Sequence, residues 1–204
     1  EEFIIKKTSQ LNKVVRVITH GCGYEKKISS NKFSHLSFHW TNISHPEASC
    51  AIISENSFRI NMQYFCEAQN YNSCLNRRIC INSRGDVKVC LKSGWHYGNI
   101  KNTSLKVIIG KPELTKYWAL NKNKIDVCKD CEFRYVCKDC RVFIKDPENI
   151  YSQPAKCTYN PYVAKWQGEE GYVPVEECGT YTRKTGFVPN KERIAELNKE
   201  IWGD

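Results

Sequence analysis

The sequence lacks several features that would place it in a common class. No stretch approaches the roughly 18 consecutive apolar residues of a membrane-spanning helix, and the chain does not open on the charged and then apolar segments of a secretory signal. We also find no glycine loop for phosphate, no zincin motif and no serine-histidine-aspartate pattern. These absences argue against a membrane protein and the common hydrolytic sites, and they favour a soluble protein of the reducing cytoplasm.

The composition indicates a folded chain with an ordinary charged surface. The 204 residues are 41% hydrophobic and 26% charged, with five Trp and eight Phe, which suits one good core or two small ones. The formal net charge is +9, but the Lys residues are scattered through the chain. We therefore interpret them as solvated surface, and nucleic acid is not the expected partner. The chain opens on Glu1-Glu2-Phe3 without an initiator Met, so we expect a piece of a longer protein.

Residues 1–72 read as the end of an α/β domain. Short strand-like runs occur at Glu2–Ile5, Lys13–Thr19, His35–Trp40 and Ala51–Ile60. Lys13–Thr19 is nearly continuous in β-branched residues, which is typical of a strand buried on both faces of a parallel sheet. Too few amphipathic helices follow for a whole α/β domain.

Residues 73–158 form a second predicted domain, because they hold eight of the twelve cysteines. The runs 79–82 and 86–90 flank Ser83-Arg84-Gly85, which predicts a β-hairpin in which Gly85 supplies a positive φ. A helix is expected from Asn102 or Thr103 to Gly110, and a second one from Pro112. Residues 159–204 are a predicted extension of loops and strands that ends in a helix capped by Asn190, with its apolar stripe packed on its own domain.

The cysteine spacing carries the chemistry. Cys128, Cys131, Cys137 and Cys140 lie within thirteen residues as two C-x2-C pairs, and each pair can turn both sulfurs toward one metal centre. Disulfides at this spacing would close strained loops and stabilise little. A zinc site would use these four residues alone. An iron-sulfur interpretation also uses four further cysteines: Cys74, Cys80, Cys90 and Cys157. The eight thiolates would then divide into two sets of four.

These motifs resemble the SPASM domain of radical SAM peptide-modifying enzymes. The resemblance rests on the order C-x5-C-x9-C, then C-x2-C-x5-C-x2-C and a later lone cysteine, with Gly85 five residues before Cys90. The run Cys74-Leu-Asn-Arg-Arg and the segments 98–100, 103–105 and 128–135 are similar to the grasp-with-spasm peptide maturases. The likeness extends over roughly residues 50–166. It implies an α+β fold: a hairpin, two helices and a cysteine knuckle (residues 128–140), following the terminal strands of a partial α/β barrel.

The resemblance also implies two auxiliary [4Fe-4S] clusters. Cluster I would be held by Cys74, Cys80, Cys90 and Cys140. Cluster II would be held by Cys128, Cys131, Cys137 and Cys157. Two features depart from the family pattern. Only two residues, Lys138 and Asp139, separate the last two knuckle cysteines, where three are usual, and the position of Cys80 is not always a cysteine in the subfamily.

The function implied is that of an auxiliary-cluster module in a peptide maturase. Such clusters relay electrons or help to position the substrate peptide. The C-x3-C-x2-C triad that binds the cluster for S-adenosylmethionine is absent from these 204 residues. We therefore expect this chain alone not to cleave that cofactor, whether it is a piece of a complete enzyme or a degenerate natural form. The subfamily further implies a precursor peptide as substrate and an ATP-grasp ligase as partner.

Two other interpretations remain open at the level of sequence. One is a zinc-binding interaction or nucleic-acid module, and the other is a disulfide-rich extracellular domain. Four cysteines are not spaced like ligand pairs and are interpreted as unliganded thiols: Cys22, Cys50, Cys66 and Cys178. Of these, Cys22 follows a predicted strand in a His-Gly-Cys-Gly run, a place where an α/β domain can hold a site.

Overall fold

The computed structural model describes residues 2, 5, 16–19, 22–29, 37–40 and 50–203, with only the backbone of 16–19 and 29. The chain divides into two compact units, Glu1–Cys50 and Ala51–Asp204. In this division residues 51–72 and 159–204 group with the cysteine-rich segment. The boundaries at 72/73 and 158/159 stay predictions. Of the predicted strand Glu2–Ile5 only Glu2 and Ile5 are described, and both are helical, so the strand prediction is wrong for these two residues. The first residues of Lys13–Thr19 fall outside the described residues.

The first unit contains a three-stranded sheet, with strands β1 (Arg16–Thr19), β2 (Lys26–Ser29) and β3 (Ser37–Trp40) in the order β1-β3-β2. Strand β1 runs parallel to β3, with Arg16 opposite Ser37, and β2 runs antiparallel to it. Phe38 and Trp40 of β3 are buried, with ring centroids 5.8 Å apart. The sequence did not predict β2, because its Lys-Lys-Ile-Ser run is mostly polar. That these strands end a barrel stays a prediction.

The second unit begins with a helix that the sequence did not predict. Helix α2 spans Met62–Asn70, and the Asn61 side chain caps it by accepting a hydrogen bond from the Tyr64 amide. The predicted strand Ala51–Ile60 is wrong. That segment contains one isolated bridge, from Ile53 to Cys157, and the 3-10 turn η1 (Glu55–Ser57). The run is apolar enough to be partly buried, but it pairs at one point only.

The cysteine-rich segment contains a short hairpin and two short helices. Strands β4 (Cys80–Ile81) and β5 (Val87–Lys88) pair antiparallel, and Gly85 in their turn has φ +92°. Helix α3 (Leu105–Ile109) is capped by Ser104, a residue or two later than expected, and Gly110 follows its end. Helix α4 (Pro112–Thr115) starts on its proline. A core of Leu75, Val87, Val89, Ile108, Leu114 and Tyr117 joins the hairpin to both helices.

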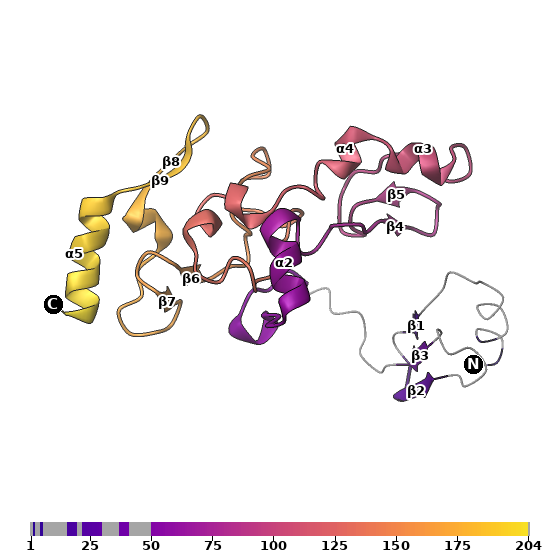
Figure 1. Ribbon diagram of the computed structural model, residues 1–204, viewed down its shortest axis with the longest axis horizontal. Coiled ribbons are helices and arrows are strands. Elements are labelled where there is room, and N and C mark those ends of the chain that lie inside the picture. Colours follow the sequence, from indigo (N-terminus) through magenta and orange to yellow (C-terminus); the bar gives the residue numbers. More distant parts are fainter. Residues whose placement is uncertain are drawn as a thin grey trace. The chain divides into compact units, whose positions relative to one another are not determined.

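The rest of the unit is built from short elements and contains a second core, formed by Val127, Val163, Val175, Cys178, Phe187 and Leu197. The 3-10 turns are η2 (Lys122–Lys124), η3 (Cys128–Asp130) and η4 (Val175–Cys178), and the strands are β6 (Tyr159–Asn160), β7 (Lys165–Trp166), β8 (Gly179–Thr182) and β9 (Gly186–Pro189). Helix α5 (Lys191–Trp202) is capped by Asn190 as expected, and its Leu197 is buried in this core. Within the second unit, α5 lies at one end, the hairpin with α3 and α4 at the other, and α2 between them (Figure 1).

None of the helices in the described residues has the length and apolar character to cross a membrane.

Candidate metal centre

Four cysteine side chains line one cavity, which we call the sulfur cavity. They are Cys128, Cys131, Cys137 and Cys157. Apart from Lys122, Arg134 and Gln153, the remaining wall is apolar or aromatic, formed by Ile53, Phe58, Val127, Phe133, Tyr159, Pro161 and Trp166. The cavity therefore combines four soft sulfur donors with a largely apolar wall, which suits zinc or iron-sulfur ligation.

Tight turns hold the knuckle cysteines. Turn η3 starts at Cys128, and the Cys131 amide donates a hydrogen bond to its carbonyl at 3.1 Å. Farther along, the Cys137 amide donates to the Phe133 carbonyl at 2.9 Å. One turn thus carries Cys128 and Cys131 and the next carries Cys137, so the three thiols can face a common space without a regular helix or strand.

The residue before the knuckle, Val127, adopts a rare backbone conformation. Its φ and ψ are +66° and −47°, and the Cys128 amide donates to the Asp126 carbonyl across it at 2.7 Å. This is a γ-turn of the strained kind, which is unfavourable for a β-branched residue. The Val127 side chain is buried in the second core. Packing therefore maintains a turn that reverses the chain immediately before the first ligand candidate.

The segment that precedes α2 closes the sulfur cavity. The Ile53 amide donates to the Lys156 carbonyl at 3.3 Å, beside the bridge to Cys157, and the Arg59 amide donates to the Val136 carbonyl at 2.9 Å. These contacts bring residues 53–59 against both the knuckle and the Cys157 loop. No spacing in the sequence links this segment to the cysteines.

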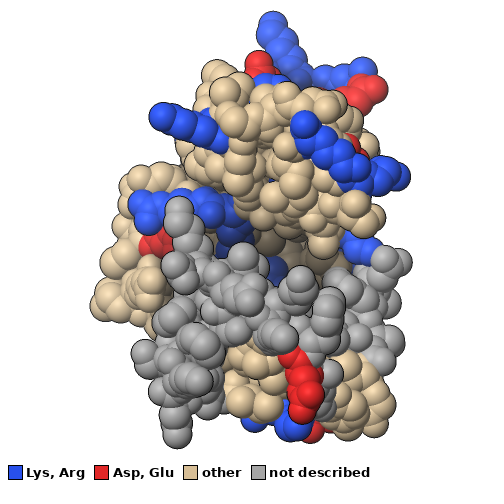
Figure 2. Space-filling view, turned by 90° about the vertical axis from the view of Figure 1, so that its right-hand side faces the viewer, with Lys and Arg blue, Asp and Glu red and all other residues tan. Residues whose placement is uncertain are grey.

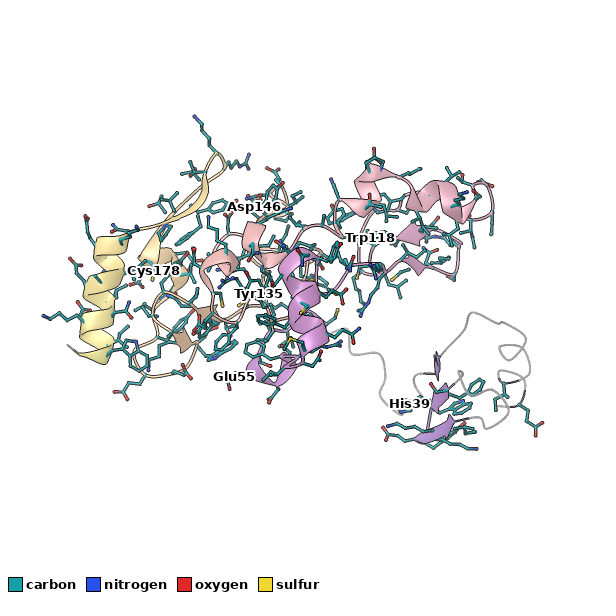
Figure 3. All side chains as sticks on the ribbon, viewed as in Figure 1. His39, Glu55, Trp118, Tyr135, Asp146 and Cys178 are labelled. Atoms are coloured by element: carbon teal, nitrogen blue, oxygen red, sulfur yellow. The ribbon has the colours of Figure 1, made fainter. Side chains whose placement is uncertain are left out.

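Four aromatic rings pack against one another beside the sulfurs. The ring of Phe133 lies 4.9 Å from that of Phe58 and 5.1 Å from that of Tyr159, between centroids, and Tyr159 lies 4.8 Å from Trp166. All four line the sulfur cavity. Such a wall lowers the local polarity and limits access by water and oxygen. The ring of Tyr135, a neighbour of Phe133 in the sequence, instead packs against that of Phe65 of α2 (Figure 3).

The thiols of the sulfur cavity are poor acids. Burial raises the pKa of Cys128 to about 12 although the Lys122 ammonium opposes this shift, and burial raises the pKa of Cys131 to about 12. Burial also raises the pKa of Cys137. These cysteines are therefore neutral at pH 7 until a metal displaces their protons, because the ligand form is the thiolate.

One buried lysine faces these sulfurs. The side chain of Lys122 is 4% exposed, and its Nζ lies 3.5 Å from Cys128 Sγ. Burial alone would lower the pKa of this ammonium, but Cys128, Cys137 and Asp139 outweigh burial and hold it above the ordinary value. A permanent positive charge beside four thiolate candidates partly offsets the negative charge that a bound metal-thiolate centre would carry.

A second group of cysteines lies near the hairpin. The pKa of Cys74 is raised to about 11, first by burial and then by the neighbouring Cys140 and Cys90. Cys74 and Cys90 also pack against the first core. The Phe143 amide donates a hydrogen bond to Cys140 Sγ at 3.4 Å, as amides commonly do to metal-bound sulfur. Cys80, the fourth candidate, lies on β4 opposite Lys88.

The first core also contains a buried donor without an acceptor. Among the described residues, the indole Nε1 of Trp118 has no hydrogen-bond partner, and Trp118 packs against the same core as Cys74 and Cys90. A buried N–H group normally finds an acceptor. The sulfur of a bound cluster would supply one, so this orphaned donor fits the metal-binding interpretation.

A buried carboxylate connects the two groups of cysteines. Asp139 lies between Cys137 and Cys140 in sequence, and its side chain is 1% exposed. One oxygen accepts a hydrogen bond from Arg141 at 2.7 Å and lies 3.8 Å from Lys122 Nζ; the other accepts from Asn72 Nδ2 at 2.6 Å.

Asn72 extends this hydrogen-bond network to the second group of cysteines. Its Oδ1 accepts hydrogen bonds from the amides of Cys74 and Leu75, at 3.0 and 2.8 Å. The Asp139 amide in turn donates to Ser73 Oγ at 3.0 Å. Spacing could not reveal this network, because its members are scattered from residue 72 to residue 141 and none is a metal ligand.

The other four cysteines are not among the residues that line the sulfur cavity. Cys22 packs against Phe38 and Trp40 in the first unit, and Cys66 is an exposed residue of α2. Cys50 is exposed as well. Cys178 is fully buried in the second core and accepts a hydrogen bond from Asn160 at 3.2 Å (Figure 3). All twelve cysteines are among the described residues.

Over the described part of the chain, no three cysteine, histidine or carboxylate side chains are close enough to hold a single metal ion.

Comparison with known families gives one match. No curated protein and no solved structure is detectably similar to the chain. Residues 73–132 match the SPASM family, described as an iron-sulfur cluster-binding domain. The matched segment includes Cys74, Cys80, Cys90, Cys128 and Cys131, while Cys137, Cys140 and Cys157 follow it. The segment that contains the hairpin and the start of the knuckle is thus similar to an iron-sulfur cluster-binding domain.

Proposed function

We propose that this chain binds two [4Fe-4S] clusters. Cluster I would use Cys74, Cys80, Cys90 and Cys140, and cluster II would use Cys128, Cys131, Cys137 and Cys157. The observation that carries the proposal is the sulfur cavity, since its four cysteines are the four of cluster II. Support for cluster I comes from the mutual influence of Cys74, Cys90 and Cys140. The SPASM match is independent support for iron-sulfur binding in general.

We further propose that the chain is the auxiliary-cluster part of a cytoplasmic radical SAM peptide maturase. Clusters of this kind supply one-electron transfer. The residues of this chain would shape that chemistry: the aromatic wall excludes water, Lys122 offsets negative charge, and the Asp139 network holds the two ligand sets together. S-adenosylmethionine would be cleaved by another segment of the complete enzyme. The substrate would be a precursor peptide, and an ATP-grasp ligase would act on the same peptide.

Anaerobic reconstitution with iron and sulfide tests the metal content. The expected result is about eight irons and eight sulfides per chain, with little zinc. One or two tightly bound zinc ions without sulfide would instead favour a zinc-binding module. A chain that takes up no metal and has few free thiols would favour the disulfide-rich alternative.

Alanine variants test the assignment of ligands. The Cys131→Ala and Cys157→Ala variants should each lose the same cluster signal, and Cys90→Ala should lose the other. The matched control is Cys66→Ala, because it removes a thiol outside both groups and should retain full iron and sulfide. Equal iron loss in all four variants would contradict the proposed ligand sets.

A further inference from the structure

A second cavity lies beside the sulfur cavity. Its volume is about 420 Å³, and we call it the acidic cavity. Val127 and Gln153 line both cavities. A space of this size accommodates a side chain or a small molecule. Because the two cavities share two wall residues, anything bound in the acidic cavity would lie close to the ligand set of cluster II.

The charge of the acidic cavity is opposite to that of the chain. Three carboxylates line it, from Asp126, Asp146 and Glu176, together with one cation, Lys145, which pairs with Glu176 at 2.9 Å. The Lys129 ammonium lies 4.0 Å from Asp126, which leaves three carboxylates against two cations. The cavity is therefore acidic, whereas the whole chain has a formal charge of +9. On the face drawn in Figure 2, Lys and Arg side chains of the described residues lie in several separate groups. The negative character is thus a local property of this cavity.

A buried acceptor at the shared wall has no partner. Gln153 is 4% exposed, and within the described residues its Oε1 accepts no hydrogen bond. A buried amide oxygen without a donor is costly, by roughly 1–3 kcal/mol. Because Gln153 lines the acidic cavity as well as the sulfur cavity, a ligand that brings N–H groups to this shared wall would supply the missing donor. It is an observation independent of the carboxylates, and it indicates the same type of ligand.

The carboxylates are held in place by neighbouring groups. The Tyr181 hydroxyl donates to Asp146 at 3.1 Å and accepts from Asn149 Nδ2 at 2.7 Å. Asp146 lies on the segment between the knuckle and β6 (Figure 3). Above Asp126, a Cβ on Gly186 would lie 2.4 Å from the carboxylate, so the chain approaches this group as closely as only glycine allows. These contacts pre-organise the acidic groups before any ligand arrives.

We propose that the acidic cavity binds the cationic side chain of a peptide, an ammonium or guanidinium group, next to cluster II. The carboxylates attract the charge, and Gln153 Oε1 accepts one of its N–H groups. The apolar side chains of Val175 and Phe187 contact the methylene stem. That this peptide is the substrate rests on the proposed function; that the cavity binds a cationic peptide does not.

Titration calorimetry with the reconstituted full chain tests this proposal. The probes are three capped pentapeptides with Lys, norleucine or Glu between two glycine pairs. The Lys peptide should bind at least tenfold more tightly than either of the others, and high salt should weaken it. Equal affinities, or no binding of the Lys peptide, would overturn the proposal.

Variants connect the binding to the cavity. The double change Asp146→Asn and Glu176→Gln should weaken the Lys peptide at least tenfold, whereas Glu113→Gln, an exposed carboxylate on α4, should leave it unchanged. Undiminished binding by the double variant would also overturn the proposal. Iron and sulfide are measured on the same samples. Peptide binding with no cluster would therefore refute the proposed function alone, and full clusters with no selective binding would refute this inference alone.

Discussion

The Lys122 ammonium lies 3.5 Å from Cys128 Sγ in the interior of the second unit. A buried ammonium is costly unless negative groups surround it; here Asp139 is such a group, and the neighbouring cysteines join it when they are thiolates. The pairing becomes stronger when the cysteines are thiolates, because the attraction is then between full charges. Lys122 is therefore placed to respond to the charge of whatever the sulfur cavity holds.

Replacement of Lys122 by Met should lower the reduction potential of cluster II. The reduced state carries one more negative charge, and the nearby ammonium stabilises it more than the oxidised state. We expect a decrease on the order of 60 mV, equivalent to about 1.4 kcal/mol for one electron. An electron paramagnetic resonance redox titration measures it. Lys124→Met is the matched control, because Lys124 is an exposed residue of the same turn. Equal shifts in both variants would contradict a specific role for Lys122.

Replacement of Asp139 by Asn should destabilise the second unit. The change keeps the size of the side chain but leaves the Arg141 and Lys122 cations in the interior without their carboxylate. Breaking a buried ion pair in this way costs about 3–5 kcal/mol. Denaturant unfolding under anaerobic conditions measures the loss, and iron content should fall for both clusters.

The exposed Glu170→Gln change provides the control for Asp139→Asn. It removes the same charge from the surface and should alter the unfolding free energy by less than about 0.5 kcal/mol. If Asp139→Asn were as stable as this control, the buried network could not be what holds the two groups of cysteines together.

The Gly85→Ala change should weaken the hairpin. Gly85 has φ +92°, and an added Cβ would lie 2.8 Å from Asn99 Oδ1. The Asn99 side chain donates to Asp86 at 3.0 Å and so ties the turn to the next loop. We expect a loss of about 1–3 kcal/mol from the strained backbone and this clash, measured as a lower melting temperature of the reconstituted protein.

Gly94→Ala is the control for this position, because a Cβ there would meet nothing within 4 Å. The difference between the two alanine variants therefore isolates conformation and contact at Gly85 from the general effect of adding a methyl group. A melting temperature lowered equally by both changes would refute the explanation.

The sequence predicted best those features that depend on local chemistry. Asn190 as a helix cap and Gly85 in the hairpin turn are such features, since each depends on its immediate neighbours. Helix α2 was missed because only Tyr64 and Ala68 of its residues are buried, which leaves no clear apolar stripe.

Of the candidate site, only the cysteine ligands could be predicted from the sequence. The C-x2-C spacing is a local pattern, whereas the burial of Lys122 and Asp139 depends on packing between segments far apart in sequence. A charged residue in a polar stretch looks like solvated surface until tertiary contacts enclose it. The same limitation applies to Gln153, whose unpartnered oxygen is visible only in three dimensions.

Removal of iron should unfold the cysteine-rich segment and leave the second core folded. Metal-binding free energy is folding free energy where the site does not pre-exist in the unfolded chain. In contrast, the core that contains Val163, Phe187 and Leu197 includes none of the proposed ligands. After anaerobic chelation, amide hydrogen exchange should accelerate in residues 74–90 and 128–157 while β8, β9 and α5 stay protected. Reconstitution should restore the protection. Unchanged exchange in the cysteine-rich segment would show that the clusters do not stabilise it, and uniform acceleration would show that the two cores unfold as one.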